Sequence, residues 1–559
     1  MEAAQNASRK NRDLRTKTNA EVIQFGKAVM ITGSQRAAAK KTGIPRSTAQ
    51  SRIERRKKRT LPEPVQAFLD TTQGMEFLHR LIVAIELVIT QIAGGGIRVV
   101  QLFLELTELD QWVASSFGSV KARIETMEKN IIRFGTEQER KLGSNMRNKK
   151  ITACLDETFP SGVCLVAIEP ISNFILLETL AKDRTCETWK NAMDNRLEQL
   201  PVEIDQVAGD GAKALTKFAK VELGAHYSPD LFHIQQDISR ATAASLSRKT
   251  ASCEKNVEVQ SKLLDQINQA ERDYSSLTVK PVGRPTDYTA RKCDALMAFE
   301  QSKLDLKQAK NRQKVVKQSI KNIGDLYHPF NMSTGAKRTP NRFEKAISKV
   351  FETIEFHAEE AGLSENNMKK IEKAARAISS MKDTISYFWT SFTTLTASLK
   401  FAKKQKAVFE KLLLPITYIG LQIPKARDAE HKRELKSTVA RLKDRLDCNE
   451  TWNSISKHEK ERYQQKAIEC AQVFQRSTSN VEGRNGYLSL QHHAFRQMNP
   501  RKLEAATVIH NYFIRRLDGS TAAERFFEQP HDDLFKWLVQ QTDYPAQSRV
   551  WSSRIKVAA

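Results

Sequence analysis

The sequence predicts a predominantly helical, multidomain protein with an α/β core, in which a five-stranded mixed sheet is flanked by helices. Three short runs rich in Val, Ile, Leu and Thr begin at residue 151, and two further short runs follow before residue 235. Strand signals then nearly vanish until about 476, where helical periodicity prevails. The 559 residues, 40% of them hydrophobic, are too many for one ordinary core.

The order of the apolar runs specifies the core further. ITACLDET, GVCLVAIEP and NFILLETLA predict three consecutive antiparallel strands. A helix is expected over 184–200, then a fourth strand in VEIDQVAGDG, a helix over 212–223 and a fifth short strand in HYSPDLFHI. This order of elements is that of the ribonuclease-H-like fold.

The N-terminal segment carries much of the positive charge. The chain has a formal net charge of +25, and residues 1–60 hold sixteen Lys and Arg against four Asp and Glu, a net of +12. Such an excess favours a polyanionic partner, because neutralised phosphates release counterions. A solvated charged tail is the alternative explanation.

Residues 34–58 predict a helix-turn-helix, with its turn at Gly43 and Pro45 in the first turn of the second helix. Ala38, Ile44 and Ile53 are expected to pack inward. The residues expected to face DNA bases and phosphates are Arg46, Gln50, Arg52, Arg55, Arg56 and Lys57.

The next segment is expected to be helical, with an apolar stripe that includes Phe77, Leu78, Ile82 and Val88. Its most apolar stretch, 81–105, has only eleven uncharged residues between Glu86 and Arg98. A membrane span needs about 20, so we expect a buried helix pair and no membrane association. The seven cysteines are scattered without any CxxC pair, which disfavours a zinc site or a disulfide framework.

These patterns divide the chain into five segments. They are a basic arm and helix-turn-helix DNA-binding domain (1–60), a helical linker domain (61–148), the first part of the α/β core (149–240), an all-helical insertion with an antiparallel hairpin near 250–323 (241–475), and the final core helix with a C-terminal helical region (476–559).

Three acidic residues stand where phosphoryl-transfer chemistry would need them. Asp156 ends the first predicted strand, Asp210 ends the fourth, and Glu482 begins a helix. The first and fourth strands are neighbours in the predicted fold, so the two aspartates should lie close together. Convergent carboxylates can hold two divalent ions, and hard oxygen ligands select Mg²⁺ or Mn²⁺.

Each assignment has an alternative. Glu157 could replace Asp156 as the ligand, and Asp210 could be only a helix N-cap. Glu450 or Glu469 could compete with Glu482. Gly483, Asn485 and Gly486 favour Glu482, because such residues mark a place where the backbone closely approaches another group.

These motifs together resemble the DDE transposases and their retroviral-integrase relatives, of a bacterial insertion-sequence kind. The resemblance rests on LDET around Asp156, VAGDGAKAL around Asp210 and STSNVEGRNGYLSL around Glu482. DLFHIQQDI, with His233, is similar to the Phe-His segment that follows the fifth strand in several transposase groups. The long helical insertion before the final Glu resembles that of the hAT-type enzymes.

The resemblance implies an enzyme that hydrolyses phosphodiesters at the ends of a mobile element and transfers the 3′-hydroxyl into target DNA. Asp156, Asp210 and Glu482 would be both its catalytic residues and the ligands of two Mg²⁺ or Mn²⁺ ions. His233 and Arg484 are further candidates for contact with the active site or a phosphate.

The implied partners are double-stranded DNA, as terminal inverted repeats and as target, and further copies of the chain in a homodimer or higher oligomer. The implied location is the bacterial cytoplasm, at the nucleoid. Two alternatives are a transposase-derived regulator that binds DNA without cleaving it and another ribonuclease-H-like nuclease.

Overall fold

The apolar runs form a single five-stranded sheet. In β2 every residue from Cys164 to Ile168 is buried, which explains why the run is continuously apolar and not alternating. The sheet order is β3-β2-β1-β4-β5. β2 and β3 pair antiparallel, whereas β4 and β5 pair parallel, so the sheet is mixed as predicted. The strands are β1 (Lys149–Thr158), β2 (Val163–Glu169), β3 (Phe174–Ala181), β4 (Val202–Gly209) and β5 (His226–Pro229).

The computed structural model describes residues 24–47, 49–50, 59–159, 162–399, 401–426, 428–495 and 498–546. The chain divides into two compact units. The first consists of Met1–Ile151, Leu155–Glu203 and Asn480–Ala559, and the second of Thr152–Cys154 and Ile204–Ser479. The first unit is therefore assembled from stretches that are far apart in the sequence.

Helices flank the sheet in the first unit. α21 packs against both β3 and the 29-residue helix α7, and α8 also packs against β3. Trp189 and Met193 of α8 are fully buried. The helices of this unit are α2 (Gln35–Thr42), α4 (Glu63–Leu69), α5 (Thr72–Glu86), α6 (Ile97–Leu106), α7 (Phe117–Asn145), α8 (Cys186–Leu197), α20 (Ser479–Phe495, its first residue in the other unit), α21 (Pro500–Tyr512), α22 (Ala522–Phe527) and α23 (Leu534–Gln541).

The apolar stripe predicted for the linker region is narrower than expected. Leu78 and Ile82 are buried, but Phe77 and Val88 are about half exposed, at 53% and 50%. The π-helical turn η1 (Leu87–Ile92) follows α5 directly and changes the helical period, which accounts for the outward position of Val88. Every helix in the described part of the chain is too short or too polar to cross a membrane.

The N-terminal helices form a small core of their own. α2 ends at Gly43, whose φ of 72° is left-handed and suits glycine. Ala38 and Ile44 are buried as predicted, together with Phe25 and Ala49. Arg46 is exposed and Gln50 is half-buried. The predicted residues Arg52, Ile53, Arg55, Arg56 and Lys57 lie outside the described residues.

The fifth strand is shorter than predicted. It ends at Pro229, and α10 (Leu231–Ser276) begins directly afterwards. The Asp230 side chain accepts a hydrogen bond from the backbone N of Phe232 and so caps the helix. His233 is therefore on the first turn of a helix and not on a strand.

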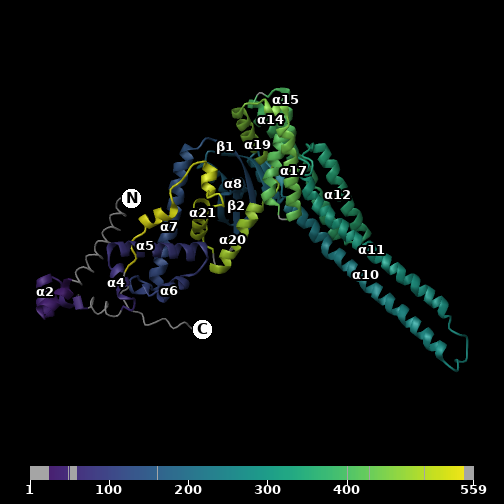
Figure 1. Cartoon of the computed structure of the whole chain (residues 1–559), viewed down its shortest axis with the longest axis horizontal. Coiled ribbons are helices and arrows are strands. Elements are labelled where there is room, and N and C mark those ends of the chain that lie inside the picture. The colour runs from purple at the N-terminus through teal and green to yellow at the C-terminus, as the bar shows by residue number, and fades with distance from the viewer. Residues whose placement is uncertain are drawn as a thin grey trace. The chain divides into compact units, whose positions relative to one another are not determined.

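α10 and α11 (Tyr288–Leu326) run side by side as a long hairpin (Figure 1). α10 continues for 46 residues because the segment contains neither glycine nor proline; the boundary expected after residue 240 falls inside it. On α11, Ala295, Ser302, Ala309 and Val316 are buried at intervals of seven residues. Such spacing is that of a coiled-coil seam, and its small residues let the two helices approach closely.

The remaining helices of the second unit bury an aromatic core that includes Phe343, Phe388 and Tyr418. They are α9 (Lys213–Lys217), α12 (Pro340–Glu360), α13 (Glu365–Ala375), α14 (Ala377–Thr396), α15 (Lys403–Val408), α16 (Leu414–Gln422), α17 (Ala429–Asp447), α18 (Glu450–Asn453) and α19 (Lys457–Gln472).

Ala309→Phe should destabilise the hairpin by about 1–3 kcal/mol, because a large side chain cannot enter a seam sized for alanine. Hydrogen exchange of α11 amides should accelerate in this variant. Gln308→Phe, on an exposed neighbour, is the control and should leave the exchange unchanged. Equal exchange in both variants would contradict the close packing of the seam.

Candidate functional site

Asp156 lies near the end of β1 and is held there by two hydrogen bonds. Its Oδ1 accepts from the backbone N of Glu157 at 2.9 Å, and its Oδ2 accepts from Nδ2 of Asn485 at 2.8 Å. The second bond joins residues 329 positions apart in the sequence. Both residues belong to the first unit, so this unit itself brings α20 to the end of β1.

The same helix carries Glu482 in its first turn. Glu482 precedes Asn485 by three residues, and residues three apart share one face of a helix, with Cβ atoms about 5–6 Å apart. The face that meets Asp156 is therefore the face that presents Glu482. The assignment of Asp156 and Glu482 to one site stays a prediction.

A buried ion pair anchors α20 to β3. The guanidinium of Arg484 donates to Glu178 through Nε at 2.7 Å and through Nη2 at 2.6 Å. The exposed fractions of the two side chains are 4% and 0%. Thr507 of α21 donates to the same carboxylate at 2.6 Å. Burial raises the pKa of the neighbouring Cys164 thiol to about 12, as expected of a dry interior.

This pairing bears on the role expected for Arg484. Its bidentate geometry is among the strongest that a guanidinium makes with a carboxylate. We therefore assign Arg484 to the attachment of α20 to the sheet and not to the phosphate contact expected from the sequence.

Glu157, the alternative to Asp156, is held by a different set of groups. The indole Nε1 of Trp189 donates to its Oε1 at 3.2 Å, and Arg184 lies 3.6 Å from its Oε2. Successive residues of a strand point to opposite faces of the sheet. Glu157 consequently faces α8 while Asp156 faces α20, and the geometry favours Asp156 as the ligand.

In the second unit, Asp210 follows directly after β4. Its Oδ1 accepts from the backbone N of Ala212 at 2.8 Å, a local turn contact that resembles the N-cap alternative. Gly211 has a φ of 88°, and its N donates to the hydroxyl oxygen of Tyr227 at 2.6 Å. Burial, and then the Asp210 carboxylate, raise the pKa of Tyr227, so the phenol stays protonated.

Asp230 is a second acid at the same edge of the sheet. Gly209 and Pro229 are paired in the parallel β4–β5 register, so Asp210 and Asp230 are the next residues on two adjacent strands. The side chain of Asp230 is fully buried and accepts from the hydroxyl of Thr478. Nε2 of His233 lies 3.7 Å from its Oδ2.

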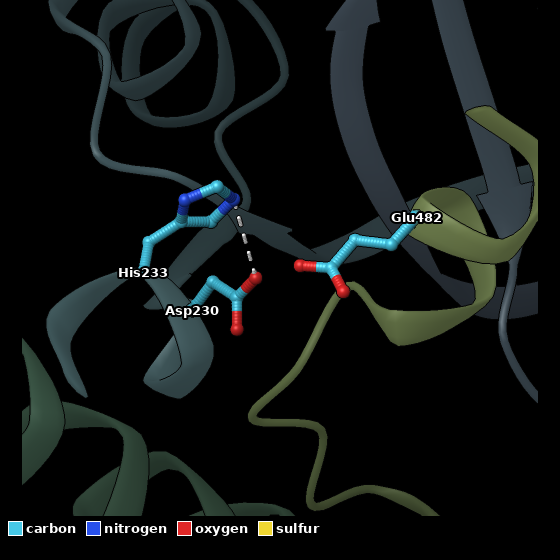
Figure 2. A group of neighbouring side chains, drawn as sticks. All are labelled: Asp230, His233 and Glu482. Atoms are coloured by element: carbon cyan, nitrogen blue, oxygen red, sulfur yellow. Dashed lines mark ion pairs between the residues drawn. The ribbon is translucent and has the colours of Figure 1, made fainter. Parts of the chain in front are cut away.

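Figure 2 shows the Asp230–His233 pair at the start of α10. Of the predicted acids, Asp156 belongs to the first unit and Asp210 to the second. Asp230 and His233 belong to the second unit and Glu482 to the first.

The donor atoms decide which ions each set of residues fits. Asp156, Glu482 and the Asn485 amide offer only oxygen, which suits Mg²⁺ or Mn²⁺. An imidazole nitrogen such as that of His233 suits the transition metals, Mn²⁺ less than Zn²⁺. The oxygen-only set fits the ion that the sequence predicts.

Two residues of this region, Asp230 and Tyr227, were not predicted from the sequence. Asp230 stands in the SPD segment before the Phe-His pair, and its buried position depends on the β4–β5 register. Tyr227 alternates with polar residues in β5 and carries no motif. Asn485 was expected to mark the site beside Glu482, but its hydrogen bond to Asp156 was not predicted.

The glycines beside Glu482 are open to their surroundings. A Cβ added at Gly483 or Gly486 would meet nothing within 4 Å, and both residues are exposed. They lie on the outer side of α20, away from the buried Arg484. No protein group among the described residues approaches them, so the expected close approach stays a prediction.

The two competing glutamates lie elsewhere in the second unit. Glu469 pairs with Lys466 on α19, three residues away. Glu450 is the first residue of α18. Glu482 is the one of the three whose helix bonds to the end of β1.

Comparison with known proteins adds one match. Residues 409–554 match a family of unknown function (DUF6399). No curated protein matches the chain. The matched segment includes α20 with Glu482, Arg484 and Asn485, and it excludes Asp156 and Asp210.

Arg484→Met should lower the free energy of unfolding by about 3–5 kcal/mol, because it leaves the carboxylate of Glu178 buried without its partner. Chemical denaturation would measure the loss. The double variant Glu178→Leu/Arg484→Met should recover much of it, since no charge is then stranded.

Lys141→Met is the matched control, because it removes one partner of an exposed pair with Asp532. It should change the free energy of unfolding by less than about 1 kcal/mol. A similar loss in Lys141→Met and Arg484→Met would mean that the Arg484–Glu178 pair does not anchor the helix.

Proposed function

We propose that the protein is a DNA transposase that uses divalent metal ions to hydrolyse phosphodiesters and to transfer the resulting 3′-hydroxyl into target DNA. The observation that carries the proposal is the 2.8 Å hydrogen bond from Asn485 to Asp156. It ties the helix of Glu482 to the strand of Asp156 across more than 300 residues of intervening chain, as an active site divided by a long insertion requires.

The sheet supports the same proposal. β1 and β4 are neighbours in the order β3-β2-β1-β4-β5, as expected of a ribonuclease-H-like core. Asp156 lies near the end of β1 and Asp210 directly after β4. We infer that this sheet is a ribonuclease-H-like catalytic core interrupted by a helical insertion.

Asp156, Asp210 and Glu482 would hold the ions as carboxylate ligands. When bound, two such ions would activate the attacking oxygen and stabilise the leaving oxygen of an in-line displacement. The chain itself fixes the carboxylates: Asn485 and the backbone of Glu157 hold Asp156, and Arg484 with Glu178 holds the helix of Glu482. His233 stands beside Asp230 and would contact the active site or a phosphate.

The N-terminal basic segment would bind the terminal repeats as duplex DNA. Its buried core of Phe25, Ala38, Ile44 and Ala49 supports a folded helical module there, and Arg46 is exposed beside it. We infer a helix-turn-helix whose second helix faces the major groove. Two element ends must be joined in one complex, so a homodimer or higher oligomer is the expected active form.

Asp156→Asn and Glu482→Gln should each abolish Mg²⁺-dependent cleavage of a labelled duplex carrying the element's own end, because each removes a carboxylate ligand. Binding to the same duplex should persist, and chelation of the metal should stop cleavage in the unchanged protein. Gel analysis of cleavage, with a binding assay in parallel, measures both.

Glu203→Gln is the matched control. It neutralises an acid at the opposite end of β4 that is exposed and paired with Lys150. Cleavage should continue in this variant. An unchanged protein that binds the element end but never cuts with Mg²⁺ or Mn²⁺ would favour the DNA-binding regulator instead.

Arg46→Ala should weaken binding to the element end and reduce the salt slope of the affinity by about one phosphate equivalent. Titrations at several salt concentrations would measure it. Lys141→Ala, an exposed cation outside the basic segment, should retain the full slope. A full slope in Arg46→Ala would exclude this residue from the DNA contact.

A further inference from the structure

Asn485 presents an unsatisfied oxygen at the site. Its Oδ1 is buried and accepts no hydrogen bond within the part of the chain that the structure describes. A buried acceptor without a donor is unfavourable, because the group has lost water and gained nothing in return. A group that arrives at the site must therefore provide the missing interaction.

The orientation of the amide follows from its partner. An ionised carboxylate only accepts hydrogen bonds, so the NH₂ side of Asn485 must face Oδ2 of Asp156. The carbonyl oxygen Oδ1 then points away from Asp156 within the same site. The hydrogen bond to Asp156 thus fixes which atom Asn485 offers to an incoming group.

The surroundings indicate what that group is. Asn485 contacts the carboxylate of Asp156 and follows Glu482 by three residues on the same face of α20. Two anionic side chains favour a cation. Divalent Mg²⁺ and Mn²⁺ accept amide carbonyl oxygens as ligands alongside carboxylates.

We propose that Oδ1 of Asn485 is an additional ligand of the divalent ion held by Asp156. The inference rests on the proposed function, since it assumes that Asp156 and Glu482 bind such an ion. Asn485 then has two roles that its two amide atoms keep separate: the nitrogen orients Asp156, and the oxygen binds the metal.

Binding of Mn²⁺ to the full-length protein, measured by electron paramagnetic resonance without DNA, tests the proposal. Asn485→Leu removes both amide atoms and should weaken binding at least about tenfold, in the range typical of lost support around a metal. Asn485→Asp keeps the oxygen but loses the NH₂ donor, and its affinity should equal or exceed that of the unchanged protein.

The two variants separate the possible roles. If Asn485 acted only by orienting Asp156, both would weaken Mn²⁺ binding, and the proposal would be overturned. If Asn485→Asp strengthened binding while Asn485→Leu left it unchanged, charge alone would explain the result, and the proposal would also fail. If neither variant changes the affinity for Mn²⁺, the proposal also fails.

Leu490→Asp is the matched control for added charge. Leu490 is 72% exposed on the same helix, five residues beyond Asn485. Its Mn²⁺ affinity should match that of the unchanged protein. Asn485→Ser provides a smaller replacement if Asn485→Leu does not fold, which far-ultraviolet circular dichroism would reveal; it too should weaken binding.

Asp156→Asn and Glu482→Gln distinguish this inference from the proposed function. If both weaken Mn²⁺ binding but Asn485→Leu does not, only the role of Asn485 is wrong. If neither weakens it, the metal site itself is wrong, and with it the proposed function.

Discussion

The attachment of α20 to the sheet is the constraint on which the candidate site depends. The chain leaves the sheet after β5 and returns only at residue 480, so nothing local fixes where the returning helix lies. The buried Arg484–Glu178 pair fixes it, with Thr507 as a third partner. A desolvated ion pair of this kind is costly to break from one side, which keeps the helix in a single position.

The two acids at the edge of the sheet, Asp230 and Asp210, differ in burial. Asp230 is fully buried and bonded to Thr478 and the N-terminus of α10, whereas Asp210 beside it is exposed. The buried acid organises the start of the helix, and the exposed one remains accessible to solvent and solutes. Because β4 and β5 pair in parallel register, the two acids that follow them lie at the same edge of the sheet.

The sequence indicated most of the architecture because the relevant signals are local. Continuous apolar runs define strands buried on both faces, and a stretch without glycine or proline permits the long helix α10. Gly43 ends α2 because only a residue tolerant of positive φ fits there. Local signals failed at two places. The π-helical turn changed the helical period and placed Val88 outward. Asp230 caps α10, so part of the expected fifth strand is helical instead.

The sequence by itself determined the candidate acids Asp156, Asp210 and Glu482, since each ends a strand or begins a helix in a recognisable motif. Only the tertiary structure decided which groups accompany them. The contact between Asn485 and Asp156, and the burial of Asp230, depend on strand order and on the packing of helices hundreds of residues away. No periodicity encodes such contacts, because their energy arises only when the distant segments are already packed together.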